Sequence, residues 1–486
     1  MLSRRRVAAR LCYHGRVGSG PRPGLGRDIG AERYAAVDAL GRPGRRVVVH
    51  RHLPPAAGAR RRSLPVAPAD AFFLHVENAG PPQQVGGLVV LEPGAAGPTV
   101  RDLRELVRAE LDGLPRFRQR LLPGGRWRRA RWVDGAIDWE WHVAERVVAA
   151  GDPVAELRRV VGELAAEPLP RDRPLWRMVL VRERDAGPVG VILLVHHAVA
   201  DGVGTVVQAL RLLRPRTELR IAERGGLRAG AAAVATATGL AQLAADARPR
   251  GRMPVGSDRR RFVTAELDLE TVRGVAHSYH ARVTDILLAV VVIALRRTRP
   301  DLMTRLRGPL RVAVPLMVRG PRSAAEGNLT AAVMIDIPLH LDDPAELLAD
   351  IVTRGDRLHS GTRALASRFV MATGLRILPE PLAGRFAATV YGGRFFHAIV
   401  SNMAGPDRPL TLANAAVAQV FPILPPASGV PLVVGALSWA GRLGLGISAD
   451  PELVDPTGFA AELPTVLAEL GPAPVADPGP PVGSGE

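Results

Sequence analysis

Short apolar runs alternate with amphipathic segments between residues 64 and 470, and this alternation limits the folds that the chain can adopt. Residues 84–91 and 189–195 have the composition of buried strands. Residues 100–111 instead carry apolar side chains at the spacing of an amphipathic helix. When strands and helices alternate along a chain, the helices pack on the faces of the sheet, so the pattern predicts an α/β fold.

Three further segments receive a local prediction. Residues 139–143 contain two Trp and a Val and are predicted to form a strand. Residues 202–213 are predicted to form one helix, and residues 283–297 a strongly apolar, buried helix. The apolar run 286–295 is too short to span a bilayer, and residues 229–245 contain too many Ala, Thr and Gly, so no spanning helix is expected.

Changes in composition divide the chain into five segments. Two terminal segments are rich in Gly and Pro and are predicted to be disordered. Two α/β parts are joined by a connection that Pro, Gly and Arg interrupt. In chain order the segments are the extension 1–62, the first part 64–215, the connection 216–260, the second part 261–471 and the tail 472–486. Whether residues 1–62 belong to the native protein stays open.

The net charge of +17 is concentrated near the N-terminus. Residues 1–62 hold 15 Arg and 3 acidic residues, a net charge of +12, which leaves +5 for the rest of the chain. The segment lacks interleaved aromatic residues on which bases could stack. We therefore expect no nucleic-acid partner, and the main body is nearly balanced in charge.

Cysteine content and the N-terminal sequence bear on the compartment. Cys12 is the single cysteine, so no internal disulfide can form, which indicates a reducing environment. No apolar core follows the N-terminal arginines, so a secretory signal is not expected. The expected location is the cytoplasm.

The strongest chemical signal is HHAVADG, residues 196–202, which follows directly after a predicted buried strand. Successive strand residues point to opposite faces, so only one of His196 and His197 can face a given cavity. A neutral histidine can remove a proton from a hydroxyl near neutral pH. Asp201 can cap the next helix, and Gly202 allows close approach of a substrate. The pattern indicates a general-base site.

Other interpretations of these residues are weaker. A buried histidine is usually a hydrogen-bonded core residue, and Asp-Gly usually marks a turn. Adjacent histidines diverge and are poorly placed to bind one metal ion, so no metal is expected. The chain shows no GxSxG, P-loop or post-strand GxGxxG motif, which disfavours a serine hydrolase and nucleotide phosphate chemistry.

The motif HHAVADG resembles the HHxxxDG motif of CoA-dependent acyltransferases related to chloramphenicol acetyltransferase and to nonribosomal-peptide condensation domains. Within that superfamily the chain resembles the bacterial wax ester synthase/diacylglycerol acyltransferase (WS/DGAT) family. Further segments in matching order support this, namely PADAFFLHVE (68–77), LPRFRQRL (114–121), RDRPLW (171–176), TDILLAVVVIALRR (284–297), RVAVPLMVR (311–319), GN (327–328), SNMAGP (401–406) and LSWAGRLGLGISAD (437–450).

The resemblance implies two acetyltransferase-like subdomains of the α+β sandwich type, with an active-site tunnel between them. It also implies that His197 is the base, that His196 supports the site from the other face, that Asp201 holds the loop and that Gly202 leaves room in the tunnel. The family usually has Asn-Asp at Thr284-Asp285, and often Val-Pro at the position of residues 403–404 (Met-Ala here), so acceptor preference or activity is open to change.

Seven further residues are candidates for substrate binding. Pro174, Leu175 and Trp176 resemble a PLW segment that lines the substrate path, although Trp176 fits a core position equally well. Thr284 and Asp285 are candidates at the start of a predicted helix, where a charge at the helix N-terminus is preferred over a catalytic role for the aspartate. Ser401 and Asn402 fit either donors to the oxyanion or a hydrogen-bonded turn.

The implied activity is transfer of a long-chain acyl group from acyl-CoA to diacylglycerol or a long-chain alcohol, with no cofactor beyond this co-substrate. Such substrates fit a peripheral location on a membrane or lipid droplet. Two alternatives remain open. One is a related acyltransferase that uses a polyketide or carrier-bound acyl group. The other is a non-catalytic protein that binds lipid or acyl-CoA.

Overall fold

The computed structural model describes most of the chain between residues 63 and 471. The described residues are 63–93, 97–125, 128–184, 187–217, 219, 229–246, 251, 253–254, 256–306, 308–317, 325–358 and 362–471. The two predicted terminal extensions lie outside them. The described residues all belong to one compact unit by their contacts.

The first sheet carries the histidine pair at the end of one of its central strands. Among the described residues it has seven strands, in the order β5-β6-β7-β2-β14-β13-β8. Its strands are β5 (Val143–Val148), β6 (Trp176–Glu183), β7 (Gly187–His196), β2 (Gln84–Leu91), β14 (Ala415–Ile423), β13 (Thr411–Leu412) and β8 (Leu213–Arg214). Strands β13 and β14 come from the C-terminal part of the chain, so this sheet draws on both halves of the sequence.

The second sheet is built wholly from the C-terminal half. Among the described residues it has six strands, in the order β11-β10-β12-β15-β16-β9. They are β11 (Thr330–Ile337), β10 (Leu310–Met317), β12 (Ala398–Met403), β15 (Leu432–Trp439), β16 (Arg442–Ala449) and β9 (Arg261–Asp268). A small third sheet joins β1 (Leu64–Pro65), β4 (Arg131–Asp134) and β3 (Gln119–Leu122).

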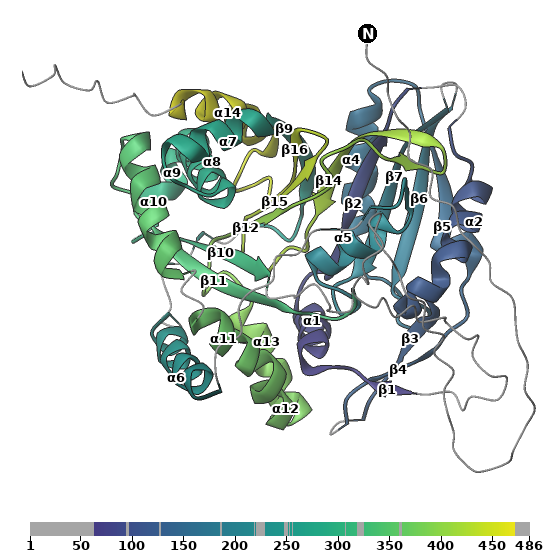
Figure 1. Cartoon of the computed structure of the whole chain (residues 1–486), viewed down its shortest axis with the longest axis horizontal. Helices are drawn as coiled ribbons and strands as arrows, with labels where there is room; N and C mark the ends of the chain where they lie inside the picture. The colour runs from purple at the N-terminus through teal and green to yellow at the C-terminus, as the bar shows by residue number, and fades with distance from the viewer. Residues whose placement is uncertain are drawn as a thin grey trace, which may run out of the picture. The chain divides into compact units, whose positions relative to one another are not determined.

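One layer of helices covers the second sheet and encloses its apolar core (Figure 1). The central member is α8 (Val283–Thr298), in which every residue from Asp285 to Leu295 is buried. It contacts α7 (Leu269–Ser278), α9 (Pro300–Arg305), α10 (Pro344–Leu358) and α14 (Pro456–Leu470). Alternate residues of β10, such as Val312 and Val314, belong to this core.

A second group of helices lies on the other side of β10 and β11 (Figure 1). It comprises α6 (Ala229–Asp246), α11 (Thr362–Phe369), the π-helical turn η3 (Val370–Gly374), α12 (Leu375–Ile377) and α13 (Glu380–Val390). Helix α6 packs closely on α11, since a Cβ at Gly239 would lie 2.1 Å from the carbonyl oxygen of Thr362. Helix α1 (Pro68–Ala79) contacts α13.

The remaining helices belong with the first sheet. They are α2 (Val100–Glu110), η1 (Leu111–Gly113), η2 (Pro115–Arg118), α3 (Trp139–His142), α4 (Pro153–Ala166) and α5 (Gly202–Leu210). Helix α2 starts in a capping box between Thr99 and Asp102. Helix α4 buries Leu157, Val160, Val161 and Leu164, whereas helix α2 lies where the amphipathic spacing of residues 100–111 predicted it.

Two local predictions were wrong. Residues 139–142 form a helical turn rather than a strand, because the Asp138 side chain accepts from the backbone N–H of Trp141 and caps that turn. The helix predicted over 202–213 ends at Leu210, and Leu213 with Arg214 instead pairs with β13. In both places a contact outweighs the local apolar pattern.

No single helix within the described residues is long and apolar enough to cross a membrane. Helices α7 and α8 pass that test together by length and composition, with a 100° bend between them. Nearly all of α8 is buried in the core of the second sheet, which accounts for its apolar composition.

Candidate active site

Strand β7 ends at His196 and places the two histidines in different surroundings. The backbone N–H of His196 donates to the carbonyl of Leu175 at 2.9 Å, and that of His197 to the carbonyl of Gln83 at 2.7 Å. These bonds fix the strand end between β6 and the start of β2. The His196 side chain is fully buried, whereas His197 is partly exposed and lines a cavity.

The His197 ring is held by a stacked aromatic ring and by a hydrogen bond. Phe73 of α1 stacks on it with ring centroids 3.7 Å apart and planes 16° apart. Nδ1 of His197 lies 2.8 Å from Oδ1 of Asn328. Because an amide oxygen can only accept, Nδ1 carries the proton in this arrangement, and Nε2 of the neutral ring keeps its lone pair.

Asn328 is itself fixed in orientation. Its Nδ2 donates to Oδ1 of Asp70 at 2.9 Å and to the carbonyl oxygen of His197 at 2.7 Å. Its backbone N–H donates to the same Asp70 oxygen at 2.8 Å. Both acceptors require the amide nitrogen on their side, so Oδ1 must face His197. A chain of contacts therefore runs from Asp70 through Asn328 to His197.

Burial shifts the pKa of two groups in this chain of contacts. The pKa of His197 is lowered to about 4, chiefly by burial, against the raising effect of the Asp201 charge. Burial raises the pKa of Asp70 to about 6, although the hydrogen bonds from Asn328 lower it. At neutral pH His197 is therefore uncharged and able to accept a proton.

His196 faces a different group. Its Nε2 lies 3.2 Å from Oε2 of Glu77, and its Nδ1 accepts from the backbone N–H of Ala198 at 2.9 Å. Burial raises the pKa of the Glu77 carboxyl, but contacts with His196, Gln83 and Arg171 outweigh this and lower it to about 2. His196 and Glu77 thus fasten β7 to α1 on the side away from the cavity.

Asp201 joins two loops. Its Oδ1 accepts from the N–H of Gly204 at 2.7 Å, which caps α5, and its Oδ2 accepts from the N–H of Leu329 at 2.8 Å. Gly327 also donates to the carbonyl of Val199 at 2.8 Å. These bonds hold the loop that carries Asn328 against the loop that carries His197.

Gly202 lies where β12 approaches the start of α5. A Cβ at this position would lie 3.1 Å from Sδ of Met403, and both residues line the cavity. The glycine therefore leaves space that a side chain would fill.

The cavity beside His197 has a volume of about 490 Å³ and largely apolar walls. Helices α6, α11, η3 and α13 form one side and the face of β10, β11 and β12 the other. Six of the chain's 10 Phe and 4 Tyr line it: Phe72, Phe73, Phe386, Tyr391, Phe395 and Phe396. Such walls suit an aliphatic chain, with few polar groups to fix its reacting end.

Ser401 and Asn402 lie at the end of β12 and line the cavity. Nδ2 of Asn402 donates to Oγ1 of Thr284 at 3.4 Å. Asp285 is buried, and its carboxylate accepts from the backbone N–H of Arg282 at 2.9 Å, as in a helix cap. Thr284 thus contacts a cavity residue, whereas Asp285 serves the start of α8.

The PLW segment lies in the core of the first half. Pro174, Leu175 and Trp176 are buried, and none of them is among the residues that line the cavity. Trp176 stacks on Phe117 at 4.7 Å and donates from Nε1 to its carbonyl at 3.0 Å.

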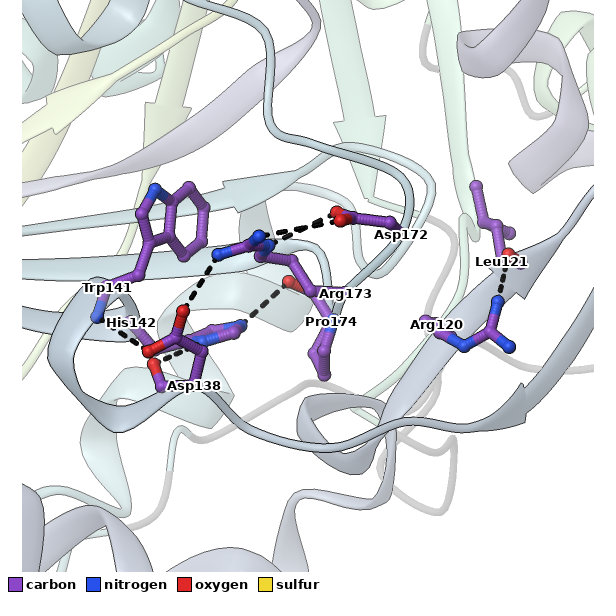
Figure 2. A network of polar contacts seen from close by, with 8 residues as sticks. All are labelled: Arg120, Leu121, Asp138, Trp141, His142, Asp172, Arg173 and Pro174. Atoms are coloured by element: carbon purple, nitrogen blue, oxygen red, sulfur yellow. Dashed lines mark hydrogen bonds and ion pairs between the residues drawn. The ribbon is translucent and has the colours of Figure 1, made fainter.

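Figure 2 shows the polar network around Pro174. Nε2 of His142 lies 3.1 Å from the carbonyl oxygen of Pro174, and Arg173 pairs with Asp138 at 3.0 Å. Since Leu175 accepts from His196, the segment supports the histidine strand by packing rather than by lining the cavity.

Sequence reasoning did not assign a role to Asp70, Phe73, Asn328 or Tyr391. Asp70 and Phe73 lie in PADAFFLHVE, and Asn328 lies in the pair GN. Both segments support the family resemblance, but neither indicates a role for these side chains. Tyr391 carried no signal, because only the packing of α13 turns it toward Phe72, Phe73 and Phe396. Within the described residues no three His, Cys, Asp or Glu side chains are grouped as metal ligands.

The fold is shared with known acyl-transferring and condensing enzymes. A wax ester synthase/diacylglycerol acyltransferase from Marinobacter aquaeolei VT8 superposes with a TM-score of 0.60 at 22% identity, over 84% of this chain and 98% of that chain. The first condensation domain of the calcium-dependent antibiotic synthetase gives a TM-score of 0.60 at 17% identity, over 86% and 98%. The α/β fold with two acetyltransferase-like subdomains is confirmed.

Sequence comparisons define the family more narrowly. The wax ester synthase/diacylglycerol acyltransferase catalytic domain matches residues 66–218, and the WS/DGAT C-terminal domain matches residues 326–471. A protein of Mycobacterium tuberculosis H37Rv described as a probable diacylglycerol O-acyltransferase is 27% identical over 78% of this chain and 92% of its own length.

The chain belongs to the wax ester synthase/diacylglycerol acyltransferase family, whose two domains together match more than half of it. It is accordingly an acyltransferase that forms an ester on diacylglycerol or an alcohol. The family resemblance read from HHAVADG is confirmed.

Proposed function

We propose that the protein transfers a long-chain acyl group from acyl-CoA to diacylglycerol or a long-chain alcohol, with His197 as the general base. One observation carries this proposal. The neutral His197 ring donates from Nδ1 to Asn328 and borders an apolar cavity, so Nε2 keeps a lone pair that can accept the proton of an acceptor hydroxyl.

The reaction needs one proton carrier. Nε2 of His197 takes the hydroxyl proton as the alcohol oxygen attacks the thioester carbonyl carbon. The tetrahedral intermediate then collapses, the carbon–sulfur bond breaks, and the imidazolium returns the proton to the CoA thiolate. The acyl-CoA is a co-substrate, and these steps require no cofactor.

The negative charge on the carbonyl oxygen requires a donor. Ser401 and Asn402 are the polar side chains that β12 adds to the cavity, and a hydroxyl or amide donor there would stabilise the oxyanion. The stacked Phe73 ring and the Asp70–Asn328 contacts hold the imidazole in one orientation throughout, which lowers the entropic cost of reaching the transition state.

The test uses purified protein with radiolabelled palmitoyl-CoA and either hexadecanol or dioleoylglycerol. Wild type should form ester and release CoA, and His197→Ala should lower kcat by roughly 100- to 10,000-fold. The exposed His340 provides the matched control, since His340→Ala removes an imidazole outside the cavity. Normal turnover by a folded His197→Ala variant would refute the role of His197.

Acceptor profiling decides between wax ester and triacylglycerol synthesis. The same assay with a carrier-bound or polyketide acceptor tests the related acyltransferase activity. Acyl-CoA binding without CoA release would indicate a protein that binds without catalysis.

A peripheral position in the cytoplasm, on a membrane or lipid droplet, is the second part of the proposal. Three large apolar side chains are exposed on α11–α13, where Ile377 is 79%, Leu382 48% and Phe369 45% exposed. Arg376 and Arg385 are exposed on the same segment, and cations next to apolar side chains suit an anionic lipid surface.

Vesicle flotation tests this surface. The protein should float with vesicles containing phosphatidylglycerol more than with pure phosphatidylcholine, and Ile377→Asp with Phe369→Asp should reduce flotation. Val147→Asp is the matched control, because Val147 is also exposed but lies on β5 of the first sheet. Equal flotation of all variants would contradict this surface.

A further inference from the structure

One face of β10 and β11 forms a wall of the cavity, and its register orders the residues along that wall. Alternate residues point to the same face of a strand. The pairs on the cavity face lie directly across the two strands: Arg311 opposite Asp336, Ala313 opposite Met334, and Pro315 opposite Ala332. Arg311, Ala313, Pro315, Ala332 and Met334 all line the cavity.

The first of these pairs is ionic, whereas the next two are apolar. Nε of Arg311 lies 2.6 Å from Oδ1 of Asp336, and Nη2 lies 3.0 Å from Oδ2, so the contact is bidentate. Arg311 is only 1% exposed. Its backbone N–H donates to Nδ1 of His397 at 3.0 Å, which ties it to the start of β12.

His197 borders the opposite end of the same wall. Strand β12 runs parallel to β10 with Val312 opposite Ala398, so Met403 lies five residues further along. Met403 lies beside Gly202 in the motif loop. Arg311 precedes Val312 by one residue, so at about 3.3 Å per residue the wall extends roughly 20 Å from the ion pair to this loop.

We propose that the Arg311–Asp336 pair is the end wall for an aliphatic substrate chain and sets the longest chain that the cavity accepts. The inference rests on the proposed acyl transfer at His197. A chain that lies along Pro315 and Ala313 meets the ion pair, and methylene groups cannot replace the contacts of the buried Arg311 guanidinium with its carboxylate. With roughly 1.2 Å per bond of an extended chain, the wall spans on the order of 16 carbon–carbon bonds.

The shared chemistry is a straight alkyl chain, supplied by either the acyl-CoA or the alcohol. Two substrate series separate these sources. In one, acyl-CoA length varies from 8 to 20 carbons with one fixed acceptor, and in the other alcohol length varies with one fixed acyl-CoA. When the Arg311–Asp336 pair is replaced, the longest accepted chain should change in one of the two series only. That series identifies whether the acyl chain or the alcohol chain reaches the pair.

The main variant is Arg311→Met with Asp336→Leu. Both charges are replaced together because replacing Asp336 alone would deprive the buried Arg311 of this carboxylate, whereas an apolar pair of similar volume is tolerated. We expect kcat/KM to rise about 10-fold for chains just beyond the wild-type limit and to change less than about 2-fold for shorter chains. A purely structural effect of the substitutions would lower kcat/KM by the same factor for all chain lengths.

Arg297→Met with Glu469→Leu is the matched control, because this ion pair joins α8 to α14 on the far side of the sheet. Ala313→Leu tests the path without touching the charges, and it should reduce kcat/KM for the longest chains first. The proposal is overturned if Ala313→Leu leaves the length profile unchanged, or if a folded double variant keeps the wild-type limit. Failure of wild type to form any ester would instead contradict the proposed function.

Discussion

Nδ1 of His197 donates a hydrogen bond to Oδ1 of Asn328 at 2.8 Å, across 131 residues of sequence. This contact selects the ring tautomer in which Nε2 is unprotonated. Asp70 and the His197 carbonyl in turn fix the amide through its Nδ2. The contact holds the imidazole of the proposed base in one orientation.

Replacing Asn328 tests this positioning role. Asn328→Ala should lower kcat by roughly 10- to 100-fold with little change in KM, because the ring loses its fixed tautomer but keeps the cavity. Asn328→Asp should raise the pKa of His197, since a carboxylate beside the ring favours the imidazolium. Steady-state kinetics at several pH values measure both effects.

Asn402→Ala is the matched control, because it removes a cavity amide that does not contact His197. Its kcat/KM is expected to keep the wild-type pH dependence. An Asn328→Asp enzyme with an unshifted acid limb would argue against the proposed contact.

The pH profile of the wild-type enzyme should reflect the lowered pKa of His197. The base works only when neutral, and its pKa is about 4 rather than 6.5, so kcat/KM should change little from pH 8 to pH 6. Activity should then fall as His197 takes up a proton. Initial-rate assays from pH 4.5 to 8 measure this, and an acid limb centred near 6.5 would contradict it.

Glu77 should stabilise the fold in a pH-dependent way. Its folded-state pKa of about 2 lies below the ordinary 4.5, a difference of about 3 kcal/mol at neutral pH. This contribution is present above pH 4.5 and is lost as the pH falls toward 2. Glu77→Gln should therefore be destabilised by about 1–3 kcal/mol at pH 7, and the gap to wild type should narrow below pH 4.5.

Urea denaturation at pH 7, 5 and 4 measures the Glu77 effect. Glu346→Gln changes an exposed glutamate of α10 and serves as the control, with an expected effect below about 0.5 kcal/mol. A gap between Glu77→Gln and wild type that stays constant over this range would count against the electrostatic explanation.

Gly202 should be required for space rather than for backbone geometry. A Cβ there would meet Sδ of Met403 at 3.1 Å, so Gly202→Ala should lower kcat/KM by roughly 10-fold. Combining it with Met403→Ala should restore part of the loss, since the shorter side chain gives way. A double-mutant cycle on kcat/KM measures the coupling, and strictly additive losses would rule out this steric explanation.

Much of the fold could be predicted from periodicity. Strand β7 and helices α2 and α8 form where their apolar patterns predicted them, because burial of apolar side chains decides local structure. The exceptions arise from contacts. The Asp138 cap makes a helical turn of residues 139–142, and β13 with β14 joins the first sheet through β2 and β8, which no local pattern indicates.

The candidate site likewise contains residues that the sequence indicates and residues that only packing brings together. His197 follows from one strand end and its motif, since the histidines and the strand are neighbours in sequence. Phe73 of α1 and Asn328 of the loop before β11 contact His197, and Asp70 of α1 contacts Asn328; these contacts form only when segments far apart in the sequence pack together. The PLW segment packs in the core against the strand that carries the histidines. Its sequence alone fits a core position and a position on the substrate path equally well.

The sequence by itself determined the class of chemistry: an imidazole at the end of a buried strand, in a chain without a nucleophile elbow or phosphate loop. The tertiary structure decided which histidine faces the cavity, which tautomer it holds and where the cavity ends. The physical reason is that motif and strand depend on neighbouring residues, whereas the pKa of His197, the orientation of Asn328 and the Arg311–Asp336 pair depend on groups that only packing brings together.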